Sequence, residues 1–404
     1  MVLDTVLWTK NACPADDCAA ELSLMNLDEV RTARDFHRSI PGYRETPLVG
    51  LSSLASMLGV GGIYVKDESK RFGLNAFKVL GGSYAMARYI AQKTGRDMSS
   101  LPYEKLVSPE VKQQIGEITF FSATDGNHGR GVAWAANRLG QKSVIYMPKG
   151  SSETRLQNIR EEGAEATIEN MNYDEAVRHA AEKAAGTPGG VMVQDTAWKG
   201  YEEIPSWIMQ GYGTMAMEAD EQLRREGVKP THIFIQAGVG SLAGGVQGYF
   251  ANAYGPDCPS TSVVEARAAD CLYRSIIAGE YTTVGGDMQT IMAGLACGEP
   301  NTISWKILKN LSTHFVSAPD WVAAKGMRTL ANPLAGDERV VSGESGAVGL
   351  GLLAALSPEY GLGSLSASMG LGPDSVVLLF STEGDTDPDK YRDIVWDGEY
   401  PSKS

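Results

Sequence analysis

The sequence has few cysteines, no long apolar run and no cluster of basic residues, and each of these absences excludes a class of protein. Five cysteines in 404 residues are too few and too scattered for a disulfide framework. No segment approaches the roughly 20 consecutive apolar residues of a membrane span. Acidic residues also interrupt the N-terminal stretch where a signal peptide is apolar. We therefore expect a cytoplasmic protein.

Positive charge is scarce as well. The 36 Lys and Arg residues face 49 Asp and Glu residues, which gives a net charge of −13. Nucleic acids and anionic membranes bind clustered positive charge, so neither is an expected partner and a small molecule is favoured instead. The five histidines form neither an HExxH pair nor a pattern with CxxC, so we expect no metal site. Whether Cys271 and Cys297 are bridged stays open, because a sequence does not give their separation.

What the chain does contain is typical of a globular protein of two or three domains. Apolar runs alternate with helical periods, a pattern that indicates parallel strands joined by helical crossovers. The expected strands are 117–123, 142–148, 164–170 and 190–195, and the expected helices are 128–140, 151–163 and 173–186. A second region has a strand, a glycine-rich turn and a helix within 231–250, then strands within 261–266 and 375–385. The pattern predicts two α/β lobes, with the ligand at strand ends or in the cleft between the lobes.

The N-terminal part is harder to interpret. The first 45 residues lack a clean period and hold polar clusters such as CPADDC, so we expect an extension of the larger lobe. Residues 46–60 predict an extended entry and a short helix, and residues 61–69 predict a strand.

Lys78 is the first candidate for chemistry, since it lies between a polar loop and a helix predicted to start near Val79. A lysine at such a junction can face a cleft, and the helix dipole is expected to lower its pKa toward the range of a Schiff-base lysine. Taken alone, a solvated surface charge is the commoner role for a lysine.

Residues Thr124, Asp125, Gly126 and Asn127 follow a predicted strand and precede a predicted helix. Backbone N–H groups and short polar side chains at a helix N-terminus suit an anion such as an amino-acid carboxylate. The alternative is that Thr124, Asp125 or Asn127 only caps the helix.

A glycine-rich turn in 236–245 follows another predicted strand. Gly238, Gly240 and their neighbours let the backbone approach a phosphate closely at a helix N-terminus. A nicotinamide cofactor is the competing interpretation, because Asp257 and Glu265 lie near the spacing expected for a ribose-binding acid.

The strand end within 378–387 is rich in hydroxyl and carboxylate groups. Ser381 or Thr382 can bind a heterocycle nitrogen through a neutral hydrogen bond. Glu383, Asp385 and Asp387 can cap a helix or bind a cation. A solvated turn is the structural alternative.

Together and in this order, these motifs resemble the fold-type II pyridoxal-phosphate enzymes, which include serine and threonine dehydratases. Within that group the chain resembles the diaminopropionate ammonia-lyases over about residues 30–398. The similar strings are KDESKRFGLNAFK, TDGNHGRGVAWAA, VIYMPKGS, VQDTAWKGY, PSWIMQGY, GGDMQTIMAGLACGEPN and SGESGAVGLG. The resemblance implies a homodimer and two open, mostly parallel lobes with the active site between them. We expect a large domain of residues 1–85 and 200–404, with a small domain of residues 86–199 inserted in it.

By this resemblance, Lys78 binds pyridoxal 5′-phosphate as a Schiff base and moves the α-proton. Asn127 binds the cofactor's 3-oxygen, and Thr382, or less favourably Ser381, faces the ring nitrogen. The phosphate lies in a loop made of Gly238, Val239, Gly240, Ser241 and Leu242. A neutral hydroxyl at the ring nitrogen favours elimination over transamination, because it makes the ring a weaker electron sink.

Asp125 departs from the wider group, in which dehydratases usually carry a small residue at this position. A carboxylate here can pair with a β-ammonium group or act as a base on the face opposite Lys78. Asp195, at the end of its own predicted strand, is the second carboxylate expected to hold the departing amine; its alternative is a turn cap.

The sequence therefore predicts α,β-elimination of 2,3-diaminopropionate, as both D and L forms, to pyruvate and two ammonia molecules. The substrate carboxylate is expected at the turn from Thr124 to Asn127, where Thr124, Asp125 and Gly126 are the predicted substrate-binding residues. The alternative is a serine/threonine dehydratase of the same fold, which does not need Asp125. A nicotinamide-dependent dehydrogenase or a catalytically silent ligand-binding relative would not need Lys78.

Overall fold

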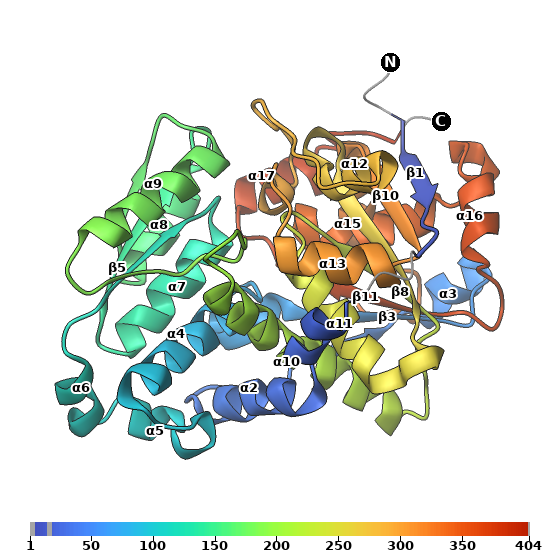
Figure 1. The fold of residues 1–404 in the computed structure, drawn as a ribbon. Helices are drawn as coiled ribbons and strands as arrows, with labels where there is room; N and C mark the ends of the chain where they lie inside the picture. The colour runs from blue at the N-terminus through green and yellow to red at the C-terminus, as the bar shows by residue number, and fades with distance from the viewer. Residues whose placement is uncertain (1–4, 14–17, 403–404) are drawn as a thin grey trace.

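A computed structural model describes residues 5–13 and 18–402 of the chain, and its larger lobe is built on one seven-stranded sheet (Figure 1). In spatial order the strands are β1 (Leu7–Lys10), β10 (His314–Ala318), β9 (Ser260–Ala266), β8 (His232–Gln236), β11 (Val376–Ser381), β3 (Gly62–Asp67) and β2 (Leu48–Gly50). The edge strands β1 and β2 are antiparallel to their neighbours, and the five inner strands are parallel. The carboxyl ends of the inner strands therefore meet at one edge of the sheet.

The smaller lobe has a four-stranded parallel sheet. Its strands lie in the order β6 (Glu165–Ile168), β5 (Lys142–Met147), β4 (Thr119–Ala123) and β7 (Gly190–Met192). The predicted fold class of two mostly parallel α/β lobes is confirmed. All four strands fall inside the expected insertion of residues 86–199, while the expected boundary after residue 85 falls within helix α4 (Val79–Thr94).

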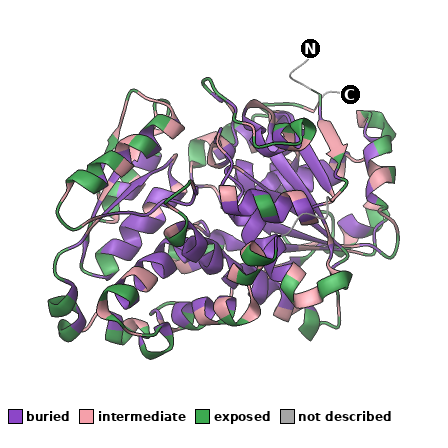
Figure 2. Cartoon of the chain, viewed as in Figure 1, coloured by how far each residue is buried: buried purple, intermediate pink, exposed green. Residues whose placement is uncertain are grey.

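Helices cover both faces of the large sheet, and this explains why its central strands β8, β9 and β11 are buried over almost their whole length. Along β8, Ile233 and Ile235 pack in one core while Phe234 packs in the other, as the two-residue period of a strand requires. The helices of the first core include α2 (Leu27–Ser39), α4, α10 (Glu203–Arg225), α11 (Ser241–Tyr254) and α13 (Thr302–Leu311). Those of the second include α3 (Ser52–Leu58), α14 (Asp320–Ala331), α15 (Glu344–Ala355), α16 (Gly363–Met369) and α17 (Pro388–Val395). Figure 2 shows the resulting buried sheet.

The small sheet is covered in the same way by α7 (Asn127–Arg138), α8 (Glu153–Glu161) and α9 (Tyr173–Gly186). On β4, Phe120 packs in the core that contains Val132 of α7, and Phe121 packs in the core that contains Val177 of α9. Helix α4 contacts both α7 of the small lobe and α10 of the large lobe, so it joins the two lobes.

The remaining helices are short or lie at the periphery. They are α1 (Ala19–Leu24), α5 (Tyr103–Leu106), α6 (Pro109–Ile115) and α12 (Cys271–Ala278), with 3-10 turns η2 (Glu68–Gly73), η3 (Met98–Ser100), η4 (Gly255–Asp257), η5 (Arg267–Ala269), η6 (Ala293–Leu295) and η7 (Pro358–Tyr360). Among the described residues, no helix combines the length and the apolar character needed to cross a membrane.

The N-terminal expectation was partly wrong. β1 extends the large sheet, as expected, but residues 27–39 form a regular helix, α2. Asn26 caps it by accepting hydrogen bonds from the backbone N–H groups of Asp28 and Glu29. The buried residues of this helix recur at helical spacing, but Arg34 and His37 are among them, so the period is not purely apolar. Part of the polar cluster at 13–18 lies outside the described residues.

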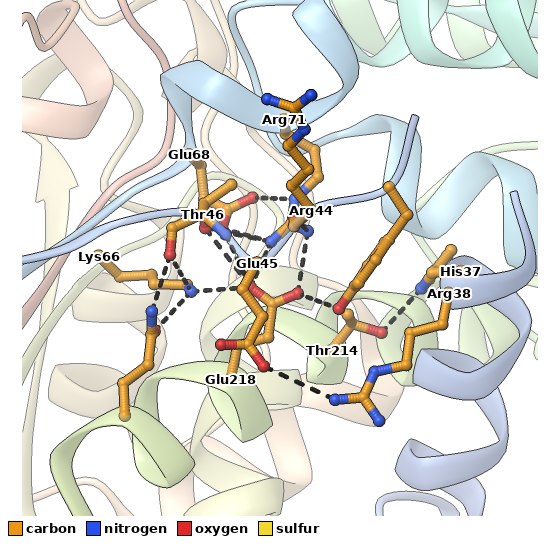
Figure 3. Close-up of polar contacts among 12 residues, drawn as sticks. His37, Arg38, Arg44, Glu45, Thr46, Lys66, Glu68, Arg71, Thr214 and Glu218 are labelled. Atoms are coloured by element: carbon orange, nitrogen blue, oxygen red, sulfur yellow. Dashed lines mark hydrogen bonds and ion pairs between the residues drawn. The ribbon is translucent and has the colours of Figure 1, made fainter. Parts of the chain in front are cut away.

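A buried ion cluster fixes the segment that leads to Lys78 (Figure 3). Arg71 of η2 bridges Glu68 and Glu218 at 2.8 and 2.7 Å, and the Lys66 ammonium lies 2.7 Å from Glu218. The side chains of these four residues are at most 1% exposed. Since Glu218 belongs to α10, the cluster anchors the end of β3 and the following η2 turn to that helix.

Candidate active site

The carboxyl ends of β4, β7, β8 and β11 converge on one cavity in the cleft between the lobes, as parallel sheets predict. Its lining includes most of the predicted site residues: Lys78, Asp125, Asn127, Asp195, Gly238, Val239, Gly240, Ser241, Leu242 and Thr382. Thr124 and Gly126 belong to the same turn as Asp125 but do not line this cavity. A second cavity of about 490 Å³ adjoins the first, and Asp125 and Tyr173 line both.

Lys78 precedes the first turn of α4 and points at Asp195, which follows β7. The Lys78 Nζ lies 2.5 Å from Asp195 Oδ2, and the Tyr212 hydroxyl donates to the same oxygen at 3.2 Å. Asp195 is therefore a charge partner of Lys78, and the interpretation of Asp195 as only a turn cap does not describe its side chain.

The electrostatics of this pair differ from the prediction that the helix dipole lowers the pKa of Lys78. Burial does lower it, but the adjacent Asp195 carboxylate outweighs burial, so the pKa of Lys78 lies above its usual value. Burial raises the pKa of Asp195, and the charge of Lys78 outweighs that effect and holds the pKa at about 2. Both groups are charged at neutral pH in this state of the protein.

A backbone pairing brings Lys78 and Thr382 to the same wall although 304 positions separate them in the chain. The Phe77 N–H donates to the carbonyl of Thr382 at 3.0 Å, and the Gly384 N–H donates to the carbonyl of Asn75 at 3.0 Å. Asn75 adopts a left-handed φ of 59°, which turns the chain into this pairing. The NAFK segment is thus fastened to the end of β11.

The turn before α7 is closed by its own side chain. The Thr124 hydroxyl accepts a hydrogen bond from the Gly126 N–H at 2.9 Å, and Gly126 itself occupies the N-cap, where it has no side chain to offer. Capping of α7 by Thr124, Asp125 or Asn127 is therefore contradicted. The Gly126 N–H is engaged within the turn, so the role of this turn in binding a substrate carboxylate stays a prediction.

Asp125 lies beside a cation that the sequence analysis missed. Arg155, in the first turn of α8, places Nη1 3.5 Å from Asp125 Oδ2 and Nη2 3.9 Å from Glu344 Oε2. Burial, with a further contribution from the Glu383 carboxylate, raises the pKa of Glu344 to about 7. Arg155 belongs to the small lobe and Glu344 to the large lobe, so this pair spans the cleft beside Asp125.

Asn127 is oriented by Glu383, whose carboxylate accepts a hydrogen bond from the Asn127 amide. The other Glu383 oxygen accepts from the Ser345 N–H at 3.1 Å, in the first turn of α15. Asp387 accepts from the Lys390 N–H at 3.4 Å and caps α17. Glu383 and Asp387 thus serve helix N-termini, one of the two functions expected for these acids, whereas Asp385 accepts from the Asn75 side chain at 3.0 Å.

The glycine-rich loop lies between β8 and α11, and its neighbours hold it from two sides. Asn301 donates to the hydroxyl of Ser241 at 2.8 Å and to the carbonyl of Asp195 at 2.9 Å. Gly240 has a φ of +100°, a conformation that favours glycine. A Cβ on Gly238 would lie 3.2 Å from the Sγ of Cys297. The loop backbone therefore packs closely at the start of a helix, where N–H groups attract an anion.

The acids required for a nicotinamide cofactor lie elsewhere. Glu265 accepts hydrogen bonds from the N–H groups of Leu272 and Tyr273 at 2.8 and 2.6 Å, and so caps α12. Asp257 is 77% exposed and pairs with Lys229. Neither lines the cavity, and the nicotinamide interpretation is wrong. Cys271 and Cys297 both carry free thiols.

The residues of the cavity fit pyridoxal phosphate. A glycine-lined loop at a helix N-terminus suits the phosphate, a lysine at the cavity wall suits the aldehyde carbon, and a hydroxyl at a strand end suits a neutral ring nitrogen. Lys78, Thr382 and the loop from Gly238 to Leu242 provide these three features in one cavity.

Several lining or neighbouring residues were not identified from the sequence. Tyr212 lies in the PSWIMQGY string, but its position in a helix gave no sign that it reaches Asp195. Arg155 lies near the start of the helix predicted over 151–163, which follows the predicted strand 142–148, and the rule that ligands bind at carboxyl ends of strands would have pointed to this helix start. His128, Gln236 and Glu344 carried no separate signal, because their roles depend on long-range packing.

Known proteins match the whole of this architecture. Residues 40–380 match the pyridoxal-phosphate dependent enzyme family. A diaminopropionate ammonia-lyase of Escherichia coli strain K12 is 54% identical over 378 residues, covering 93% of this chain and 94% of that protein. The crystal structure of the Escherichia coli enzyme in complex with D-serine superimposes with a TM-score of 0.92, at 50% identity and with 99% of each chain covered. Its complex with an aminoacrylate-PLP azomethine reaction intermediate gives a TM-score of 0.90, at 49% identity and with the same coverage.

These matches extend over nearly the full length of both partners, well beyond the motifs of the cavity. The chain belongs to the pyridoxal-phosphate dependent enzyme family and, within it, to the diaminopropionate ammonia-lyases.

Proposed function

We propose that this protein eliminates ammonia from 2,3-diaminopropionate, in both the D and the L form, and releases pyruvate and a second ammonia after hydrolysis. The observation that carries the proposal is a cavity in which two carboxylates, Asp125 and Asp195, accompany the cofactor-type lysine Lys78. When bound, pyridoxal phosphate supplies an electron sink for the negative charge left on the substrate Cα. Lys78, Asn127, Thr382 and the loop of residues 238–242 would hold it.

The two enantiomers require two bases. The α-proton of the D form points to the opposite face of the substrate from that of the L form, so one fixed side chain reaches only one of them. Lys78 is the base assigned to the L form, a role that requires it first to lose the proton that Asp195 stabilises. Asp125, which extends from the turn before α7 beside Arg155, is the base assigned to the D form.

The second amino group of 2,3-diaminopropionate explains why the cavity holds two carboxylates, Asp125 and Asp195. Asp195 bonds an ammonium group, that of Lys78, in the structure, and the Tyr212 hydroxyl supports the same oxygen. A substrate with an ammonium group at Cβ matches such an acceptor, whereas the hydroxyl of serine or threonine offers it no charge. This favours a diamino acid over the alternative substrates of a serine/threonine dehydratase.

The test is pyruvate release by the cofactor-loaded protein with D- and L-2,3-diaminopropionate and L-serine, and 2-oxobutyrate release with L-threonine. We expect both diaminopropionate enantiomers to be preferred. Asp125→Asn should lower kcat for the D form by a factor of about 10²–10⁴, as expected for loss of a general base, and leave the L form largely active. Preference for serine or threonine, or an equal loss for both enantiomers, would refute the substrate or the two-base assignment.

A homodimer and a cytoplasmic location, both expected from the sequence analysis, are further parts of this proposal. Light scattering on the purified protein tests the first, and fractionation of cells that make the protein tests the second.

A further inference from the structure

Gln236, the last residue of β8, lies behind Thr382 at the wall of the cavity. Its side chain is buried, and Nε2 contacts two oxygens, the carbonyl of Phe380 at 2.9 Å and the hydroxyl of Thr382 at 2.7 Å. Gln236 and Thr382 are 1% and 3% exposed, so water does not compete freely for these bonds. Both residues line the cavity.

The chemistry of the three groups determines the direction of both hydrogen bonds. A carbonyl oxygen only accepts, so the amide nitrogen of Gln236 must face Phe380. The same nitrogen contacts Thr382, and an amide nitrogen only donates. The Thr382 oxygen is therefore an acceptor toward Gln236, and its own hydrogen must be donated to another group.

We infer that Gln236 is a positioning residue that makes the Thr382 hydroxyl a donor toward the cavity, so that a cofactor ring nitrogen facing Thr382 is held without a proton. The inference rests on the proposed function for the placement of the ring. It adds a residue with no direct role in the chemistry and assigns a direction to the hydrogen bond at the nitrogen.

The direction of the hydrogen bond between Thr382 and the ring nitrogen affects the reaction. An unprotonated ring nitrogen withdraws electrons weakly, so negative charge at Cα is better discharged by expelling the β-amine than stored on the ring. A carboxylate in place of the Gln236 amide would reverse the order of donation. Thr382 would donate to residue 236 and offer the ring nitrogen a lone pair, which binds only a protonated nitrogen.

The experiment measures the ring nitrogen directly. Holoenzymes of the wild type, Gln236→Glu and Gln236→Met are loaded with cofactor labelled with ¹⁵N in the ring, and their ¹⁵N NMR shifts are recorded from pH 6 to pH 9. Gln210→Glu is the matched control, because Gln210 is also buried and donates to a backbone carbonyl, that of Leu24, but does not line the cavity.

We expect an unprotonated shift at every pH in the wild type and in Gln210→Glu. Gln236→Glu should move the ¹⁵N signal to the position of a protonated ring nitrogen. Gln236→Met neither donates to nor accepts from Thr382, so the ring nitrogen should titrate between pH 6 and pH 9. If Gln236→Glu does not fold, the methionine variant decides. A protonated wild-type nitrogen, or variants whose signal matches an unprotonated wild type, would overturn the inference.

Pyruvate release from diaminopropionate, measured on the same wild-type sample, separates this inference from the proposed function. Pyruvate release together with an unchanged nitrogen signal in the variants means that the inference about Gln236 alone fails. Absence of pyruvate release together with the expected nitrogen shifts means that the proposed substrate fails while the role of Gln236 stands.

Discussion

Replacing Glu218 by Gln should destabilise the protein strongly, because it unbalances the buried cluster of Figure 3. Glu218 lies 2.7 Å from Lys66 and accepts from Arg71 at 2.7 and 2.9 Å. Lys66 and Arg71 are balanced by Glu68 and Glu218, so the substitution leaves one buried positive charge without a partner. The segment that leads to Lys78 would lose its charged attachment to α10, while Lys66 would keep Gln222 of that helix at 2.7 Å.

The size of the loss in unfolding free energy depends on the partners that Lys66 and Arg71 keep after the substitution. Removing one partner of a buried ion pair costs about 3–5 kcal/mol. Arg71 keeps Glu68 at 2.8 Å, and Lys66 keeps the carbonyl of Thr46 at 2.8 Å, so we expect the lower end, about 3 kcal/mol. The matched control is Glu117→Gln, which removes a pair with Lys142 that is more than 60% exposed on both sides. Such a pair contributes about 0–1 kcal/mol.

The assay is equilibrium unfolding in urea, followed by tryptophan fluorescence, with refolding curves that superimpose on the unfolding curves. At pH 7 the unfolding free energy of Glu218→Gln should lie about 3 kcal/mol below that of the wild type. A penalty indistinguishable from that of Glu117→Gln would refute the reasoning, because the buried cluster would then contribute no more than a surface pair.

The pH dependence checks the electrostatic origin of this effect. Burial raises the pKa of Glu218, but the charges of Arg71 and Lys66 outweigh it and hold the pKa below its usual value. The stabilisation is therefore complete above the pKa of an unfolded glutamate, about 4.3, and is lost as the pH falls through the lower folded value. The difference between wild type and variant should shrink below about pH 4, and a difference that grows there would contradict the assignment.

Three further predictions concern the cavity. Asp195→Asn should lower the pKa of Lys78, because burial remains and the carboxylate is lost. The pH profile of cofactor attachment, measured by borohydride trapping, should then move to lower pH. An unshifted profile would count against the ion pair. Arg155→Met should lower turnover of the D enantiomer by roughly 10-fold, about 1.4 kcal/mol, with little effect on the L enantiomer, and equal losses would show a purely structural role. Gly240→Ala adds a side chain at a φ of +100° in the glycine-rich loop and should weaken cofactor binding by about 10-fold in a fluorescence titration. The control is Gly361→Ala, at a φ of +71° outside the cavity lining, which should leave cofactor binding unchanged.

Local patterns in the sequence determined the secondary structure and much of the site. Alternating apolar runs and helical periods predicted the small sheet and most strands of the large sheet, because each strand and helix must bury its own face, but they did not predict β1 or β10. Helix α9 has the predicted bounds, whereas the helix predicted over 151–163 is shorter: α8 ends at Glu161, and Gly163, with a φ of +92°, follows it. Lys78 and the glycine-rich loop were recognisable because a cofactor requires these residue types at strand ends and helix starts.

Tertiary structure alone decided how those residues act on one another. The pKa of Lys78 is raised and not lowered because Asp195, 117 positions away in the chain, lies against it in the fold. The direction of the hydrogen bond at Thr382 depends on Gln236, 146 positions away. Charge interactions and hydrogen bonds in a buried site depend on distance in space, and no spacing along the chain encodes that distance.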